Sequence, residues 1–137
     1  MFLKALLVCD DARFELSGTV TLVGVHREVV GGIQVGEQIR FVRLVVVAMV
    51  GGLTGVGEIQ HRYSLRAVDG AHVSRESPLV AEDRDVTSDE HVFLFGNAPL
   101  IFPTAGAYEV VLEVRAMQDE ATYRYGFWVE AIGAVPA

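Results

Sequence analysis

Residues 41–50 read FVRLVVVAMV, and their only polar side chain is that of Arg43. Five of the ten residues are valine, which loses rotamer freedom in a helix and packs well on a pleated sheet. A helix that crosses a membrane needs about 20 apolar residues, so this run is too short for that role. We therefore predict a central β-strand over 41–50 with apolar side chains on both of its faces.

The two faces of this predicted strand differ in what must cover them. A strand in a β-sandwich normally buries one face and leaves the other in water. Here the first face carries Val42, Leu44, Val46, Ala48 and Val50, and the second carries Phe41, Arg43, Val45, Val47 and Met49. We expect the second face to be covered either by another part of the chain or by a partner subunit.

The interface candidates are Arg43, Val45, Val47, Met49 and Trp128. Trp128 anchors an interface if its face is exposed and belongs to the core if that face is buried, and of the two we favour the core.

The length and composition favour one domain that associates with itself. A chain of 137 residues suits a single domain over 1–137 with an ordinary hydrophobic core. Hydrophobic residues make up 51% of the chain, and the mean hydropathy is +0.36. A subunit interface is a common destination for such an excess. We expect a homo-oligomer, with a dimer favoured, and leave open an unknown protein partner.

The charge and the single cysteine limit partners and location. The net charge of −7 disfavours nucleic acid and anionic membranes as partners, because both require clustered lysine and arginine. Cys9 has no second cysteine to pair with, which is compatible with a cytoplasmic location. The apolar run 2–8 ends at Asp10 and Asp11 without a small-residue cleavage site, so we interpret it as a first strand and not as a signal peptide.

Alternating hydrophobicity predicts the remaining elements. Over 58–68, Ile59, His61, Tyr63 and Leu65 point one way and polar residues the other, the period of a half-buried strand. Further strands are predicted over 2–9, 19–27, 33–35, 71–76, 91–95, 108–116 and 122–132, with a turn at 10–13 and an irregular crossing at 96–104. Eight or nine short strands with turns between them indicate an all-β fold. We predict a single antiparallel β-sandwich of immunoglobulin-like or jelly-roll-like type.

One corner of the chain supports this fold locally. Gly106 and Tyr108 enter a strand shortly after Pro103. A tyrosine in this place can return its hydroxyl to the upstream backbone, as in the tyrosine corner of immunoglobulin-like sandwiches. The Cys…Trp…Cys core of antibody domains is absent.

A second resemblance lies at the N-terminus, in CDDAR at residues 9–13, Glu15, Gly18 and LVGV at 22–25. This segment resembles the opening of a family of small uncharacterised bacterial proteins, which begin with a hydrophobic strand ending in Cys-Asp-Asp-x-Arg. The resemblance covers about the first 26 residues and the turn from 103 to 108. The sequence departs from the family pattern at Thr19, Thr21 and His26, where the family has Lys, Ser and Tyr. The resemblance implies a β-sandwich and no known activity.

The acidic segment 82–90 is the candidate cation site. Its metal-ligand candidates are Asp83, Asp85, Asp89 and Glu90. Calcium prefers such oxygen donors, but an EF-hand starting at Asp83 would need glycine where Ser88 stands and glutamate where Leu94 stands. Two interpretations stay open: a looser cation site, joined by Asp10 and Asp11 if the loops meet, and a solvated loop that keeps the protein soluble.

Motifs for nucleotides, metals and nucleophiles are missing. The glycine-rich loop 51–57 places Glu58 and Ile59 where a phosphate-binding loop needs Lys and Ser or Thr, so we expect no cofactor. The histidines are dispersed along the chain at His26, His61, His72 and His91. They could meet across strands, but we interpret His61 as a hydrogen-bonded core residue. Asp10, Asp11 and Arg13 are expected to fix a turn, with each aspartate bonding backbone N–H groups and Arg13 bonding a carboxylate.

These observations favour a non-catalytic module over an enzyme. We expect a protein–protein interaction or structural module that self-associates through a sheet face. The alternative is a module that binds a small ligand or divalent cation through residues 82–90. Nothing in the sequence indicates a specific chemistry.

Overall fold

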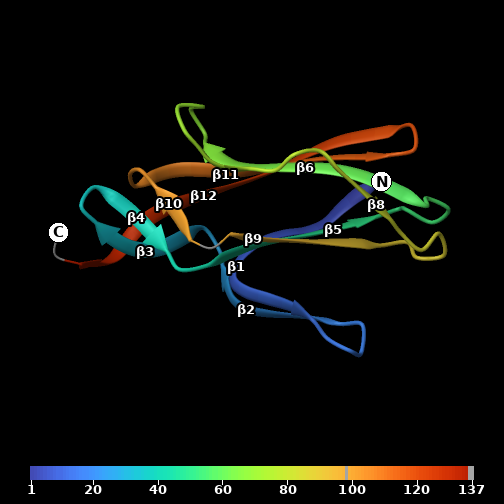
Figure 1. Cartoon of the computed structure of the whole chain (residues 1–137), viewed down its shortest axis with the longest axis horizontal. Coiled ribbons are helices and arrows are strands. Elements are labelled where there is room, and N and C mark those ends of the chain that lie inside the picture. Colours follow the sequence, from blue (N-terminus) through green and yellow to red (C-terminus); the bar gives the residue numbers. More distant parts are fainter. Residues whose placement is uncertain (98, 136–137) are drawn as a thin grey trace.

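The chain forms two β-sheets that face each other, as seen in a computed structural model (Figure 1). The structure describes residues 1–97 and 99–135. Every regular element in this part of the chain is a strand, so the all-β prediction is confirmed, and no helix long and apolar enough to span a bilayer occurs there. The strands are β1 (Phe2–Phe14), β2 (Val20–His26), β3 (Val29–Val35), β4 (Gln38–Phe41), β5 (Leu44–Gly51), β6 (Glu58–Ala67), β7 (Val73–Glu76), β8 (Val80–Asp83), β9 (His91–Asn97), β10 (Leu100–Phe102), β11 (Gly106–Ala116) and β12 (Asp119–Val135). Twelve strands in the described residues exceed the eight or nine predicted.

The strands divide unequally between the two sheets. The four-stranded sheet has the order β2-β1-β5-β9. The eight-stranded sheet has the order β10-β4-β3-β12-β11-β6-β7, with β8 pairing to β6 beside β7. All pairings are antiparallel except that of β12 with β3, so the purely antiparallel prediction is wrong at this pair. The strand β3 follows β2 of the other sheet directly along the chain, and it runs in the same direction as its neighbour β12.

The valine-rich segment belongs to both sheets. Phe41 ends β4 in the eight-stranded sheet, and Leu44 begins β5 in the four-stranded sheet. Val42 lies in the crossing between them and is 92% exposed, so the prediction that it shares a buried face is wrong. Within β5 the predicted alternation is confirmed: Leu44, Val46, Ala48 and Val50 enter the main core, whereas Val45 and Val47 belong to a second cluster.

The second apolar face of β5 is covered by the N-terminal hairpin. The strand β1 continues through residues 10–13, where a turn was predicted, and the chain reverses at residues 15–19. Figure 1 shows the β1–β2 hairpin below β5 and β9. Its residues Ala12 and Leu22 pack with Cys9, Val45 and Val47. The cover therefore comes from the same chain and not from a partner subunit.

Two interface candidates are consequently internal. Val45 and Val47 are each 1% exposed and cannot contact another subunit while the hairpin stays in place. Arg43 forms an ion pair with Asp11 of the hairpin, with Nη2 and Oδ1 3.1 Å apart. Met49 is half-buried beside Ala5 of β1. The sequence did not predict that this hairpin covers β5, because the residues of β5 that it contacts lie more than 20 residues further along the chain.

The predicted tyrosine corner is present. The Tyr108 hydroxyl donates a hydrogen bond to the carbonyl oxygen of Thr104, 2.8 Å away. The buried Tyr108 ring packs edge-on against Phe102, with ring centroids 4.6 Å apart. The inward alternation predicted along β6 and β11 is also confirmed, because Ile59, His61 and Val110 are all buried.

Three short strands were not predicted: β4, of which only Phe41 fell within a predicted strand, β8 and β10. The strand β10 lies inside the segment 96–104, which was expected to be irregular, and its residues Leu100 and Phe102 are buried in the core. Residue 98 of that segment lies outside the described residues. The strand β8 includes Glu82 and Asp83, which were assigned to the acidic loop. Strands of three or four residues are too short to show a reliable period in the sequence.

Candidate functional site

The outer face of the eight-stranded sheet carries rows of polar side chains set by the strand register. One row aligns Arg62 of β6 with Glu113 of β11 and Thr122 of β12. The next row aligns Ser64, Val111 and Arg124. A third row aligns Arg66, Glu109 and Gly126. Residues directly opposite each other on antiparallel strands share a face, so these side chains lie together on the surface.

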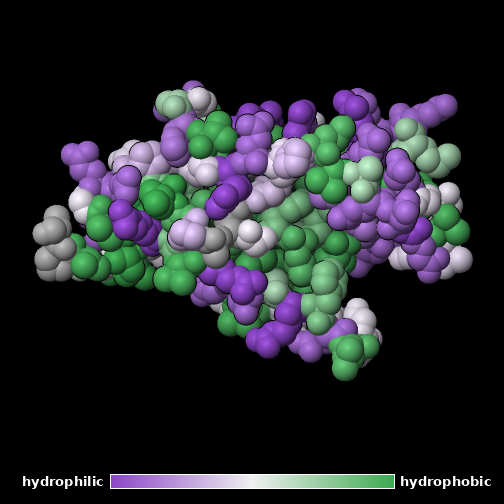
Figure 2. Space-filling view, in the orientation of Figure 1, coloured by the Kyte–Doolittle hydropathy of each residue, from purple (hydrophilic) through white to green (hydrophobic). Residues whose placement is uncertain are grey.

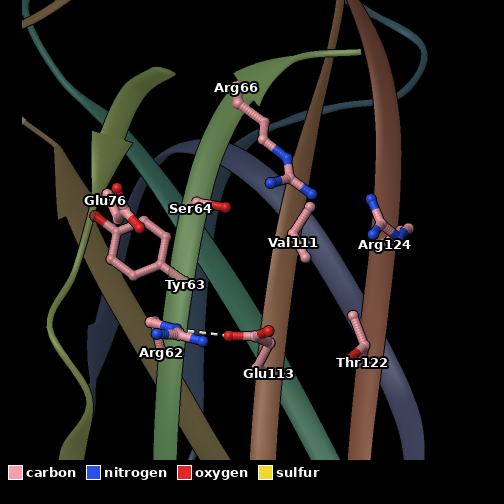
Figure 3. A pocket seen from close by; sticks show the side chains of 9 residues that line it. All are labelled: Arg62, Tyr63, Ser64, Arg66, Glu76, Val111, Glu113, Thr122 and Arg124. Carbon is pink, nitrogen blue, oxygen red and sulfur yellow. Dashed lines mark hydrogen bonds and ion pairs between the residues drawn. The ribbon is translucent and has the colours of Figure 1, made fainter. Parts of the chain in front are cut away.

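The middle row is hollow because its central side chains are short. Ser64 and Val111 lie between rows that contain long arginine and glutamate side chains. The result is a surface cavity of about 260 Å³ (Figure 3). The cavity is lined by Arg62, Tyr63, Ser64, Arg66, Glu76, Val111, Glu113, Thr122 and Arg124. The sequence alone predicts that the side chains at 62, 64 and 66 point outward, because the residues of β6 alternate. Their neighbours on β11 and β12 could not be predicted, because the strand register sets them.

Ion pairs connect the arginines and glutamates around this cavity. Nε of Arg62 donates to Oε2 of Glu113 at 2.5 Å, and this bond lowers the pKa of the Glu113 carboxyl and raises that of Arg62. Nη1 of Arg124 donates to Oε1 of Glu109 at 2.7 Å. Nε of Arg66 lies 3.5 Å from the same oxygen. Two guanidinium groups thus share the single carboxylate of Glu109.

The other half of this outer face is apolar. Past Gly126, β12 runs beside β3, which pairs in turn with β4 and β10. Six large hydrophobic side chains, each at least 40% exposed, lie on the outer side of these strands; the register places five of them, and the contact with Gly31 places Ile132, which lies where the register shifts. This apolar face consists of Val29, Ile33, Ile101, Trp128, Ile132 and Val135. Figure 2 shows hydrophobic residues gathered at the end of the molecule where β3 and the end of β12 lie.

Close packing of small and large residues makes the apolar face continuous. A Cβ atom on Gly31 would lie 2.4 Å from Cγ2 of Ile132, so the isoleucine side chain lies directly over this glycine. Ile33 lies over Gly133 in the same way, with its Cδ1 atom 3.3 Å from the place of a Cβ atom. Trp128 is 48% exposed and adjoins Val29, so the core position favoured for it from the sequence is wrong, and it stands as the interface candidate at the surface. Its chain neighbour Phe127 is buried.

Two histidines meet at a carboxylate between the sheets. Nε2 of His91 on β9 lies 2.9 Å from Oε2 of Glu82 on β8, and Nε2 of His61 on β6 lies 3.4 Å from Oε1. His61 is 5% exposed and packs against Phe93, with ring centroids 4.7 Å apart. The core position predicted for His61 is confirmed, but 3.4 Å is too long for a well-formed hydrogen bond.

The environment of this cluster shifts its protonation equilibria. Burial lowers the pKa of His61, because desolvation disfavours the imidazolium form, and the nearby Glu82 carboxylate only partly offsets this. Burial alone would raise the pKa of Glu82, but the hydrogen bond from His91 and the proximity of His61 outweigh it and lower that pKa. Among the described residues, no three His, Cys, Asp or Glu side chains are arranged to hold a metal ion.

The acidic loop is organised around an internal cation, the guanidinium group of Arg84. Its Nη1 donates to the carbonyl oxygens of Leu53 and Val56, both at 2.6 Å, and its Nη2 to that of Ser88 at 2.7 Å. Backbone carbonyl oxygens of this kind would be ligands for calcium. In this loop they are already occupied by the protein's own positive charge.

The four metal-ligand candidates have separate partners. Asp85 accepts hydrogen bonds from the backbone and hydroxyl of Thr87, which lower its pKa. Asp89 accepts from the backbone of Gly52 and the Thr54 hydroxyl, with the same effect. Glu90 pairs with Lys4 at 2.7 Å, and Asp83 lies opposite Glu58 on paired strands. The structure therefore does not bring these four carboxylates together.

The motif at residues 10–13 joins strands and does not form a turn. Oδ1 of Asp11 accepts a hydrogen bond from the backbone N–H of Ala12 at 2.9 Å, which is the type of contact predicted for this aspartate. Oδ1 of Asp10 lies 2.7 Å from Nε2 of His26 on β2. The guanidinium that pairs with Asp11 comes from Arg43, whereas Arg13, the predicted partner of a carboxylate, is exposed. The contact of Asp10 with His26 joins the two strands of the hairpin, and that of Asp11 with Arg43 joins the hairpin to the residue that precedes β5.

Comparison with known proteins adds no further assignment. No protein-family model matches the chain, and no curated protein matches it. The N-terminal resemblance to a family of small bacterial proteins therefore stays a prediction. The two halves of the outer sheet face, one apolar and one charged, are the surface features on which a function can be argued.

Proposed function

We propose that the protein is a non-catalytic interaction module that forms a homodimer through its apolar face. The observation that carries this proposal is the gathering of six exposed large hydrophobic side chains on the outer side of β3, β10 and the end of β12. Monomeric proteins rarely expose a large contiguous apolar surface, and such surfaces commonly mark protein contacts. Trp128 supplies an aromatic side chain of the kind that dominates the binding energy of interfaces.

A second copy of the chain fits this face because its charges are self-complementary. In a two-fold contact, residue i of one subunit touches residue j of the other, and the reverse contact also forms. Arg40 on β4 and Glu130 on β12 lie on the same outer face, on opposite sides of β3. Both are exposed, and neither takes part in a salt bridge within the described residues. Two copies packed through β3 bring Arg40 of one subunit opposite Glu130 of its partner.

The sole tryptophan of the chain makes the dimer directly observable. Trp128 lies in the apolar face, so its fluorescence should shift to shorter wavelength as the protein concentration rises into the micromolar range. Light scattering should give the mass of a dimer over the same range. W128A should be a monomer, whereas V42A, which removes an exposed apolar side chain outside the face, should remain a dimer.

Charge reversal tests the arrangement of the two subunits. R40E and E130R should each weaken the dimer, and the double variant R40E/E130R should restore it. The control R13E changes an exposed arginine on the hairpin and should leave the mass unchanged. A wild-type protein that is monomeric at these concentrations would contradict the proposal. A dimer that survives W128A would contradict the choice of face.

The same proposal includes a finer description of the fold. We infer an immunoglobulin-like arrangement for the sandwich, supported by the hydrogen bond from Tyr108 to Thr104 at the expected corner. The parallel pairing of β3 with β12 is a departure from a wholly antiparallel arrangement. This pairing brings the end of β12 beside β3 and so creates the apolar face.

A further inference from the structure

The charged half of the outer face gathers hydrogen-bond donors around an apolar floor. Figure 3 shows the guanidinium groups of Arg66 and Arg124 on either side of Val111, with the Ser64 hydroxyl directed into the same gap. The three donors come from β6 and β12, and Val111 of β11 lies between them. An apolar floor reduces competition from water and strengthens electrostatic contacts made above it.

Two guanidinium groups, those of Arg66 and Arg124, lie at this end of the cavity with the carboxylate of Glu109, and a second carboxylate, that of Glu76, lies opposite Ser64 on the paired strand. Glu109 is one carboxylate shared by Arg66 and Arg124, and its ion pairs use only Nε of Arg66 and Nη1 of Arg124. A guanidinium has five N–H donors in a planar fork, so each arginine keeps terminal N–H groups for a further acceptor. Arg62 is balanced separately: Glu113 bonds it, and Glu76 also stabilises its charged form.

We infer that this cavity is a binding site for a phosphate-type oxyanion held by Arg66, Arg124 and Ser64. Two guanidinium forks and a hydroxyl match the several acceptor oxygens of such a group. The cavity of about 260 Å³ is open at the surface, so the phosphate can be carried by a larger ligand. This site lies on the opposite half of the face from Trp128 and does not depend on the proposed dimer.

Titration with inorganic phosphate at constant ionic strength tests the inference. Backbone amide chemical shifts in 62–66, 109–113 and 122–126 should change and saturate at millimolar phosphate. R66Q and R124Q should each weaken binding by about ten-fold, the loss expected for one charge-assisted hydrogen bond. R115Q is the matched control: Arg115 is exposed on the same sheet face, but it pairs with Glu120 outside the cavity, so its loss should leave binding unchanged.

A variant with the opposite effect keeps the test informative if an arginine variant is poorly folded. Glu109 competes with phosphate for the same two guanidinium groups, so E109Q should bind phosphate more tightly than the wild type. Weaker or unchanged binding in E109Q would overturn the assignment. So would an equal loss of binding in R115Q, shifts scattered over all exposed arginines, or acetate that binds as tightly as phosphate.

Discussion

Asp10 of β1 contacts the backbone of Gly24 on β2 so closely that no side chain fits between them. A Cβ atom on Gly24 would lie 2.1 Å from Oδ2 of Asp10, and Gly24 has a φ of +64°. Oδ1 of the same aspartate lies 2.7 Å from His26. This close approach lies within the hairpin that covers Val45 and Val47.

We expect G24A to destabilise the protein by more than about 1 kcal/mol, because it combines left-handed backbone strain with a clash. Urea denaturation measures this loss. The control is G18A: Gly18 also has a positive φ, of +84°, but nothing lies within 4 Å of the place of its Cβ atom. G18A reports the backbone strain alone, so equal losses in the two variants would show that the contact with Asp10 has no energetic role.

A second prediction concerns the contribution of the tyrosine corner to stability. Y108F removes the hydrogen bond to Thr104 and leaves its carbonyl oxygen without that donor, so the free energy of unfolding should fall by about 1 kcal/mol. Tyr123 is half-buried and provides the control Y123F. A loss in Y108F no larger than in Y123F would argue that the corner is incidental to stability.

Stability should fall in mild acid because of the cluster at Glu82. A group whose pKa is lowered in the folded state stabilises the fold above its unfolded pKa, and this stabilisation disappears as the pH falls through its folded pKa. The pKa of His61 is lowered from its ordinary value of 6.5, so the loss should begin near pH 6.5 as the pH decreases. The lowered pKa of Glu82 adds a further loss beginning near pH 4.5, its ordinary value.

Thermal unfolding across this pH range measures the effect. H61L should flatten the dependence below pH 6.5, whereas H72Q, at a histidine away from the cluster, should retain it. A wild-type melting temperature that stays constant between neutral pH and pH 5 would contradict the prediction.

A fourth prediction concerns the contribution of Arg84, the internal cation of the acidic loop, to stability. R84M leaves the carbonyl oxygens of Leu53, Val56 and Ser88 without their donors, so it should cost about 3 kcal/mol of stability. R13M, at an exposed arginine, should cost little. Denaturation of both variants by urea gives the comparison.

The effect of calcium on the melting temperature distinguishes the two interpretations of this loop, a cation site and a solvated loop. Because Arg84 occupies the carbonyl oxygens, calcium should not raise the melting temperature of the wild-type protein. A calcium-dependent rise that is lost in the double variant D83N/D85N would instead support the cation site considered from the sequence.

Local patterns determined the parts of the fold that depend on near neighbours. The alternation of Ile59, His61 and Tyr63 fixes the inner face of β6, because successive side chains of a strand point to opposite faces. The corner at Tyr108 is also local, since its acceptor Thr104 lies four residues away. The charged outer side of β6, with Arg62 and Arg66, followed from the same period.

Tertiary structure decided everything that depends on partners distant along the chain. The sequence by itself determined that the valines of 44–50 are buried on both sides, because their apolar side chains alternate without a polar face. It could not determine that the cover is the hairpin at residues 12–22, nor that Arg124 and Glu109 face Arg66. Strand register and the crossing between sheets set those contacts, and neither leaves a periodic signal in the sequence.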